Sequence, residues 1–263
     1  MSILLFLLSL NFGILDKMPV YENPIAYVRS PQSSINIFFS KEDFEKELTY
    51  LEGQIGKSIA LITISPNKYM FFQLGLEASV WMSLGKIDDR FPLITQDFLM
   101  AAPIYFRIDD FSGAVKYNHI SAHLGDGSKI FDKRWRPIVY SRDFISVDLA
   151  YDILIKGFLS KFYISCSYAT TMYPDVKRFS AGGGFETTYN NALYFVPYFA
   201  YDLRYNQDMD SFDHAGQIGF KMSNDKRSIF DVRLALIGYY GSDRRGQLIG
   251  HDVEQFGVGL IVK

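Results

Sequence analysis

Apolar and polar residues alternate with a period of two along most of this sequence. Between Tyr69 and Leu84, the even positions from Phe72 to Met82 are apolar, whereas the odd positions between them include Gln73 and Glu77. The same alternation recurs in 97–107, 144–152, 161–167, 217–222, 231–240 and 255–262. Successive side chains of a β-strand point to opposite faces. The pattern therefore predicts strands that each have one apolar and one polar face.

The composition of the polar face and the spacing of the strands favour a barrel over a sandwich. The polar face is rich in Gly, Ser, Gln and Tyr, with isolated opposite charges such as Asp97 and Arg107, which suits a narrow polar lumen. Long and short connections alternate, as in outer-membrane barrels. We expect one all-β domain over residues 34–263, an antiparallel transmembrane β-barrel of about twelve strands. A soluble β-sandwich or lipid-binding barrel is the remaining alternative.

The N-terminal region carries different signals. Residues 1–15 hold an apolar run of the length of a signal-peptide core, although no Lys or Arg precedes it, so we expect an atypical signal peptide. Residues 16–33 carry three prolines and are expected to be an extended linker or periplasmic arm. In 41–51, apolar residues at i, i+4 and i+7 predict one short external helix. No stretch of 18 apolar residues predicts a transmembrane helix.

Composition and charge narrow the possible functions. Aromatic residues make up 16% of the 263 residues, and the net charge is −2 with no basic stretch, so we expect no nucleic-acid partner. Cys166 is the single cysteine, which excludes an intramolecular disulfide and a cysteine-based zinc site. We expect no cofactor.

The stretch 117–126 concentrates the chemically capable side chains. His119, Ser121 and His123 stand two residues apart and therefore share one face of a strand. On the predicted topology this strand runs outward and ends below the long loop 124–141. The intervening apolar residues Ile120 and Ala122 are expected to face lipid, with Leu124, so that the polar triplet faces the lumen. The predicted lumen or ligand-binding cluster comprises Glu77, Asp97, Arg107, His119, Ser121, His123 and Asp148.

The same stretch resembles a bacterial outer-membrane family known as domain of unknown function 1207. The similarity rests on His119-Ile-Ser-Ala-His-Leu-Gly-Asp126, followed by Tyr140-Ser-Arg-Asp143. Upstream, Gln73-Leu-Gly-Leu-Glu77 and Ala102-Pro-Ile-Tyr-Phe-Arg107 are similar to the preceding strands of the family. The resemblance implies a β-barrel in the bacterial outer membrane and supplies no reaction.

The His-x-Ser pair also resembles the arrangement in outer-membrane phospholipase A and in lipid A deacylases. That resemblance implies His119 as the base and Ser121 as the nucleophile, with Asp126, Asp143 or Asp148 orienting the imidazole. A serine hydroxyl needs such an adjacent base. Those enzymes present the pair on the lipid-facing wall, whereas the predicted face turns it inward. A lipid hydrolase is therefore the alternative function.

The main hypothesis is a structural, binding or narrow-transport barrel of unknown ligand. Its expected partners are membrane lipids, with lipopolysaccharide as a candidate ligand for basic loop residues such as Arg136 and Arg244. A metal held by His119, His123 and Asp126 is not expected, because positions i and i+4 of a strand lie about 13 Å apart.

Overall fold

The computed structural model describes residues 11–15, 18–42, 47–131, 136–223 and 231–263. These residues form thirteen strands, one short α-helix and one 3-10 turn. The elements are β1 (Asn11–Ile14), β2 (Ser33–Glu42), β3 (Glu47–Asn67), β4 (Met70–Gly85), β5 (Leu93–Ile108), β6 (Phe111–Leu124), α2 (Ser128–Phe131), β7 (Tyr140–Ile155), β8 (Phe158–Tyr173), β9 (Phe179–Tyr189), β10 (Tyr194–Asn206), β11 (Ser211–Ser223), β12 (Val232–Ser242), η1 (Gly246–Leu248) and β13 (Asp252–Val262). None of the helices among them is long and apolar enough to cross a membrane.

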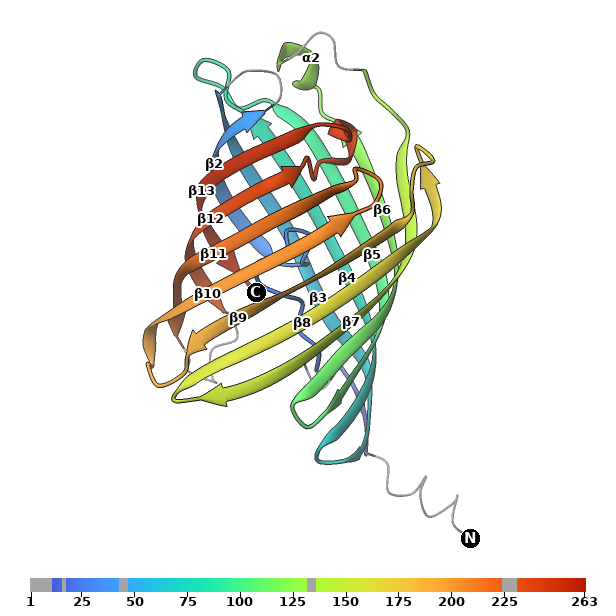
Figure 1. Cartoon of the computed structure of the whole chain (residues 1–263), viewed down its shortest axis with the longest axis vertical. Helices are drawn as coiled ribbons and strands as arrows, with labels where there is room; N and C mark the ends of the chain where they lie inside the picture. The colour runs from blue at the N-terminus through green and yellow to red at the C-terminus, as the bar shows by residue number, and fades with distance from the viewer. Residues whose placement is uncertain (1–10, 16–17, 43–46, 132–135, 224–230) are drawn as a thin grey trace.

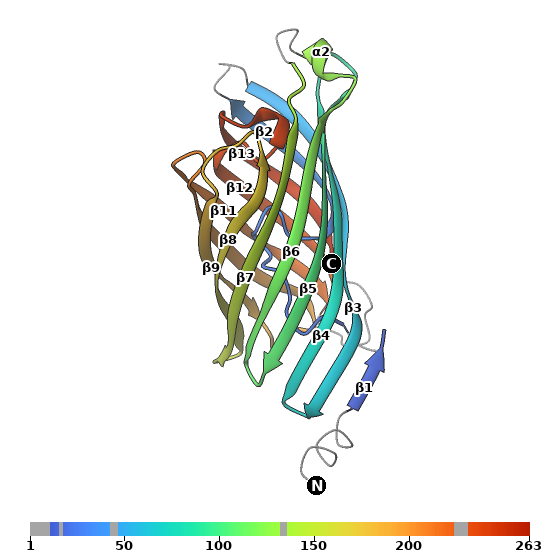
Figure 2. The ribbon, with the colours of Figure 1, turned by 90° about the vertical axis from the view of Figure 1, so that its right-hand side faces the viewer.

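Strands β2 to β13 close into a barrel in which every neighbouring pair is antiparallel (Figure 1). Each strand pairs with the next in the chain, and β13 pairs with β2 to close the ring. The additional strand β1 pairs with the far end of β3, from Asn11↔Ser65 to Ile14↔Ile62, and lies beside that strand in Figure 2. The predicted all-β, antiparallel barrel of twelve strands is confirmed.

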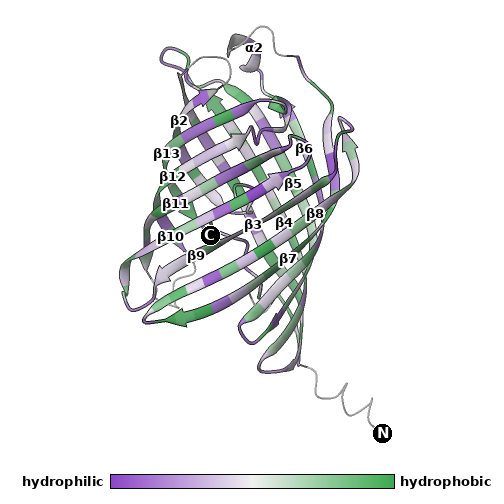
Figure 3. Cartoon of the chain, viewed as in Figure 1, coloured by the Kyte–Doolittle hydropathy of each residue, from purple (hydrophilic) through white to green (hydrophobic). Residues whose placement is uncertain are grey.

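Alternation along each strand separates an apolar outer wall from a polar interior, as the striped hydropathy of the strands in Figure 3 shows. On the outside, Leu74, Ile104 and Ile164 are 45%, 55% and 64% exposed. On the inside, Gln73 and Glu77 are buried. The polar face of these strands is buried and the apolar face is exposed. This arrangement is typical of transmembrane β-barrels.

The ends of the barrel differ in the length of their connections. The tight turns, such as Asp109–Asp110 between β5 and β6, lie at one end of the barrel, whereas α2 and the longer loops lie at the opposite end (Figure 1). The predicted alternation of connection lengths holds from β4 to β9, whereas the next two connections, 190–193 and 207–210, are equally long.

The helix predicted for 41–51 does not form. Lys41 and Glu42 continue β2, residues 43–46 lie outside the described residues, and β3 begins at Glu47. Lys41 pairs with Glu47, and β3 pairs with β4 on its other side. An isolated helix of this length is marginal in water, so two rows of interstrand hydrogen bonds outweigh its local preference.

Residues 18–32, expected to be a linker or periplasmic arm, lie inside the barrel. Asn23 donates from Nδ2 to Glu77 Oε1 on β4 at 2.8 Å. The Ile25 N–H donates to Glu186 Oε2 on β9 at 2.8 Å. Because β4 and β9 stand far apart in the strand order, this segment crosses the lumen from one wall to another.

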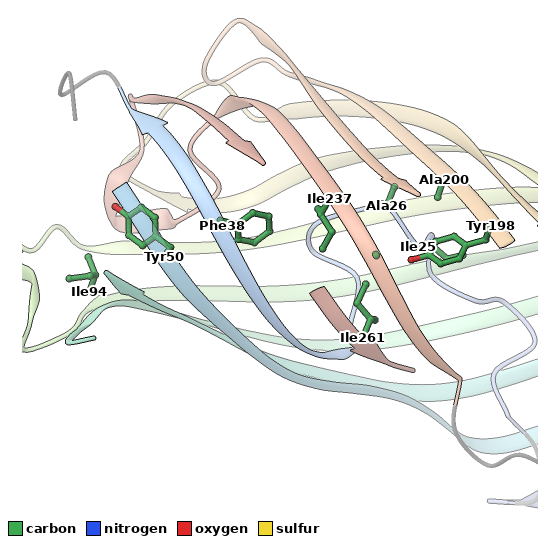
Figure 4. Close-up of a cluster of buried hydrophobic side chains, with 10 residues drawn as sticks. Ile25, Ala26, Phe38, Tyr50, Ile94, Tyr198, Ala200, Ile237 and Ile261 are labelled. Atoms are coloured by element: carbon green, nitrogen blue, oxygen red, sulfur yellow. The ribbon is translucent and has the colours of Figure 1, made fainter. Parts of the chain in front are cut away.

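The same segment and one outer loop fill the lumen at successive levels. Ile25 and Ala26 pack among inward side chains that include Phe38, Tyr198 and Ile237 (Figure 4). Nearer the end with the longer loops, Arg29 pairs with Asp97 at 2.9 Å and donates to the carbonyl of Arg244. The residues after Arg244 turn back into the barrel mouth, where Gly246 and Gln247 are buried. The lumen is therefore packed with protein.

Candidate functional site

The polar face of β6 near its outer end points away from the lumen. The His119 side chain is 47% exposed and His123 is exposed, while Ile120 and Ala122 are 7% and 2% exposed. The predicted orientation, with the histidines inward and Ile120 and Ala122 in lipid, was therefore the reverse of the observed one.

The inward apolar face of β6 has a tertiary cause. Ile120 and Ala122 form a buried cluster with Leu99 and Tyr140, against which Ile249 of the outer loop packs. The barrel mouth is thus apolar where it is capped by a loop. A period of two identifies both faces of a strand, but it does not say which one faces the lumen.

His119 is held by a carboxylate from the neighbouring strand. Asp143 on β7 is the register partner of His119, and His119 Nδ1 lies 2.8 Å from Asp143 Oδ1. An ionised carboxylate only accepts hydrogen bonds, so Nδ1 carries the proton and Nε2 of the neutral ring is left as an acceptor. Asp143 was one of three candidate orienters, and the register selects it.

A β-bulge lies beside Asp143. Between Asp143 and Phe144, the register with β8 moves from Thr171 to Ala169, which leaves Thr170 as the extra residue. The Thr170 hydroxyl donates to the Asp143 carbonyl at 3.0 Å. Bulges commonly redirect a side chain next to a functional site, and this one fixes the backbone that carries the carboxylate.

Ser121 stands two residues beyond His119 on the same outward face. Its Oγ has no hydrogen-bond partner among the described residues. The two Cα atoms are separated by roughly 6.6 Å, so the two side chains are neighbours on this face. Catalytic hydrogen bonds often close only when substrate is bound. Ser121, His119 and Asp143 have the residue types and the order of a nucleophile, base and orienter.

The glycines that follow the histidines have a structural role. The Gly125 N–H donates to the Ile94 carbonyl at 2.7 Å, and the Gly127 N–H donates to the Leu93 carbonyl at 2.9 Å. A Cβ at Gly125 would lie 2.3 Å from the Leu93 carbonyl oxygen. The His-Leu-Gly-Asp sequence therefore ends β6 closely against the start of β5. Asp126 is exposed in this loop, and Asp143 occupies the position beside His119 instead.

The other residues of the predicted lumen cluster lie on the inner wall and form a separate network. Lys116 Nζ is 3.3 Å from Glu77 Oε2 and 3.2 Å from Asp148 Oδ2, and it also donates to Asn23. Asp97 pairs with Arg29 of the lumen segment. Arg107 pairs with Asp152 at 2.7 Å. From the sequence, we expected these charged residues to form one cluster with His119, Ser121 and His123. In the structure, the charged residues lie on the inner face of the barrel wall, and His119, Ser121 and His123 lie on its outer face.

Lys116 was missed as the centre of the inner network. It could have been found from its position in the alternation, because it shares a face with Ile120 rather than with His119. Within the described part of the chain, no group of three or more His, Cys, Asp or Glu side chains is arranged to hold a metal ion.

Comparison with solved structures returns outer-membrane barrels. Outer membrane phospholipase A from Escherichia coli matches 95% of this chain and 95% of its own, with a TM-score of 0.59 and 13% identity. The Salmonella typhi outer membrane phospholipase, in a dimer with bound calcium, matches 95% of this chain and 97% of its own, with the same TM-score of 0.59 and 13% identity. KdgM porin matches 86% of this chain and 97% of its own, with a TM-score of 0.40 and 10% identity. At 13% identity, the likeness to the two phospholipases shows the barrel fold alone.

Comparison with curated proteins gives no match. A family model described as a protein of unknown function matches residues 54–263, from the middle of β3 to the C-terminus. The matched region holds the whole of β4 to β13. It includes Ser121, His119 and Asp143 on the outer wall and Glu77, Lys116 and Asp148 on the inner wall. This outer-membrane-like barrel therefore belongs to the DUF1207 family.

Proposed function

We propose that this protein is an outer-membrane hydrolase of lipid acyl esters. The observation that carries the proposal is the outward-facing row of Ser121, His119 and Asp143, with the 2.8 Å hydrogen bond between His119 and Asp143. The sequence favoured a polar cluster that braces the lumen, but that interpretation requires these side chains to point inward.

The position of the row on the wall supports a lipid substrate. Polar and ionisable side chains in contact with lipid are costly, and they are commonly retained for function. β6 starts at Phe111, immediately after a tight turn. From there to Ser121 the rise is roughly 25 Å, at roughly 3.3 Å per residue and a strand tilt of roughly 40°. An outer-membrane barrel has an apolar band roughly 25 Å tall. With short turns on the periplasmic side, Ser121 stands at the outer edge of this band, near the ester linkages of the outer leaflet.

The reaction follows from the residues. Ser121 Oγ attacks the ester carbonyl carbon while its proton passes to His119 Nε2, and Asp143 stabilises the imidazolium through Nδ1–H. The C–O bond of the ester then breaks, the alcohol leaves with the proton from His119, and the acyl group stays on Ser121. Water, deprotonated by His119, releases the fatty acid and regenerates the serine. The substrate class comprises membrane phospholipids and the acyl esters of lipopolysaccharide.

The packed lumen argues against transport as the main role. The segment 18–32 contacts walls on different sides of the barrel, and the loop after β12 enters the mouth. A cavity in the lumen, lined by Arg29, Tyr140 and Arg204 among other side chains, has a volume of only about 140 Å³. The name of the structural neighbour, outer membrane phospholipase A, indicates that a barrel of this fold can carry a phospholipase.

The test is covalent labelling combined with turnover. Purified protein in detergent micelles and in vesicles would be treated with a fluorophosphonate probe and assayed on phospholipid and on lipopolysaccharide, with calcium and with a chelator. We expect labelling of Ser121, identified by peptide mass spectrometry, and fatty-acid release that Ser121→Ala abolishes. Ser160→Ala is the control, because this serine also faces outward and bonds Thr187. If the wild type releases fatty acid no faster than Ser121→Ala does, on both phospholipid and lipopolysaccharide, the proposal is excluded.

A further inference from the structure

The backbone around Ser121 offers no donor for a developing oxyanion. Strand β6 pairs without interruption with β5, from Phe111↔Ile108 to Leu124↔Thr95, and with β7, from Phe111↔Tyr151 to Ala122↔Tyr140. Every backbone N–H near Ser121 is therefore used in the ladders and lies in the plane of the wall. Acyl transfer needs hydrogen-bond donors where negative charge develops on the carbonyl oxygen. Here these donors must come from side chains.

Two outward polar side chains flank Ser121, one on each neighbouring strand. Ser141 of β7 is its direct register partner. Gln96 of β5 is the partner of His123, one outward position further along β6. Side chains directly opposite across antiparallel strands have Cβ atoms about 4.5–5.5 Å apart, and diagonal neighbours at about 7–8 Å remain within reach of long side chains. Both donors can thus approach an oxygen bound at Ser121.

Neither side chain is used by the fold. Ser141 and Gln96 have no side-chain hydrogen bond to any described residue, although both lie on the outer wall, where partners from water are scarce. Polar groups of this kind are normally paired when they are removed from water. Ser hydroxyls and Gln amides are among the side chains that serve as oxyanion donors.

Building on the proposed hydrolase function, we propose that Ser141 and Gln96 form a side-chain oxyanion hole for the ester carbonyl attacked by Ser121. Ser141 donates from β7 and Gln96 donates from β5, so the oxyanion is held between the strands on either side of the nucleophile. The arrangement replaces the backbone amides that a closed β-ladder cannot supply.

The experiment measures kcat and KM separately for Ser141→Ala, Gln96→Ala and the conservative Ser141→Thr, on a soluble ester and on phospholipid vesicles. Loss of one oxyanion donor lowers kcat by about 10²–10³-fold. We expect a fall of that order for each Ala variant with little change in KM, a matching fall in the rate of fluorophosphonate labelling, and recovery in Ser141→Thr. Heat-modifiable gel migration confirms folding, and Ser160→Ala is the matched control.

The outcomes separate this inference from the function on which it rests. If the wild type is neither labelled nor active, the proposed hydrolase function is refuted. If the wild type is active and the Ser141→Ala and Gln96→Ala variants keep its kcat, or change only in KM, the oxyanion hole is refuted. The assignment of Ser121 as the nucleophile would then still stand.

Discussion

Replacing Asp143 by Asn tests the pairing that the structure adds to the His-x-Ser sequence. The carboxylate accepts from His119 Nδ1 at 2.8 Å, which leaves Nε2 free to take the serine proton. An Asn at this position can instead donate its amide N–H to Nδ1. That contact stabilises the tautomer with the proton on Nε2, which cannot act as a base.

The magnitude follows from the exposure of the pair. A hydrogen bond to a charged group contributes about 1.5–3 kcal/mol, and each 1.36 kcal/mol changes a rate about tenfold, so kcat should fall about 10–150-fold. In a buried triad the corresponding change costs about 10⁴-fold. The His119 and Asp143 side chains are 47% and 24% exposed on the outer wall, so the pair is not enclosed by protein as a buried triad is, and breaking it leaves no fully buried group without a partner. We therefore expect kcat to fall about 10–150-fold and not 10⁴-fold.

The assay is ester hydrolysis in detergent micelles, with kcat and KM determined for the wild type, Asp143→Asn and Asp143→Ala. Asp110→Asn is the control, because Asp110 is exposed in the tight turn that precedes β6, whereas His119 lies toward the outer end of that strand. If Asp143→Asn keeps kcat within about threefold of the wild type while Ser121→Ala is inactive, Asp143 does not orient the base.

Three further outcomes test the barrel itself. In planar bilayers, protein that retains residues 18–32 should show no unitary conductance, because this segment fills the lumen; regular conductance steps would contradict the packed interior. Lys116→Met should destabilise the barrel by about 3–5 kcal/mol, because it leaves Glu77 and Asp148 as buried charges without their partner. Denaturant titration of vesicle-reconstituted protein measures this, and a change below about 1 kcal/mol would show that the network is dispensable. Leu236→Arg, on the outer wall of β12, should cost about 2–4 kcal/mol in vesicles if that wall is embedded in lipid, and no loss would place it outside the apolar band.

The sequence alone was sufficient for the architecture. Alternation of period two is a local property, because each residue of a strand is turned away from its neighbours whatever the rest of the chain does. It predicted the strands from β4 onward, and the spacing of the connections predicted an even-numbered antiparallel barrel. The local helical pattern of 41–51 was misleading, because interstrand pairing on both sides of β3 outweighs a short helix.

What the sequence left open were relations between distant residues. The register of β6 and β7 joins His119 to Asp143 rather than to Asp126 or Asp148, and a shift of one residue would have reversed the faces. The course of residues 18–32 through the lumen depends on partners such as Glu77 and Glu186, which lie far along the chain.

The orientation of His119 and Ser121 shows most clearly which features follow from the sequence and which depend on the tertiary structure. Alternation places both side chains on one face of β6, and this much follows from the sequence. Whether that face meets lipid or lumen depends on how the closed barrel packs the opposite face, and here Ile120 and Ala122 are buried against Leu99 and Tyr140. Lys116 shares the face of Ile120 and Ala122 and already indicated that this face is the inner one. Because polar residues occupy the other face at the outer end of β6, only the packing in the closed barrel shows that the row of His119 and Ser121 faces outward.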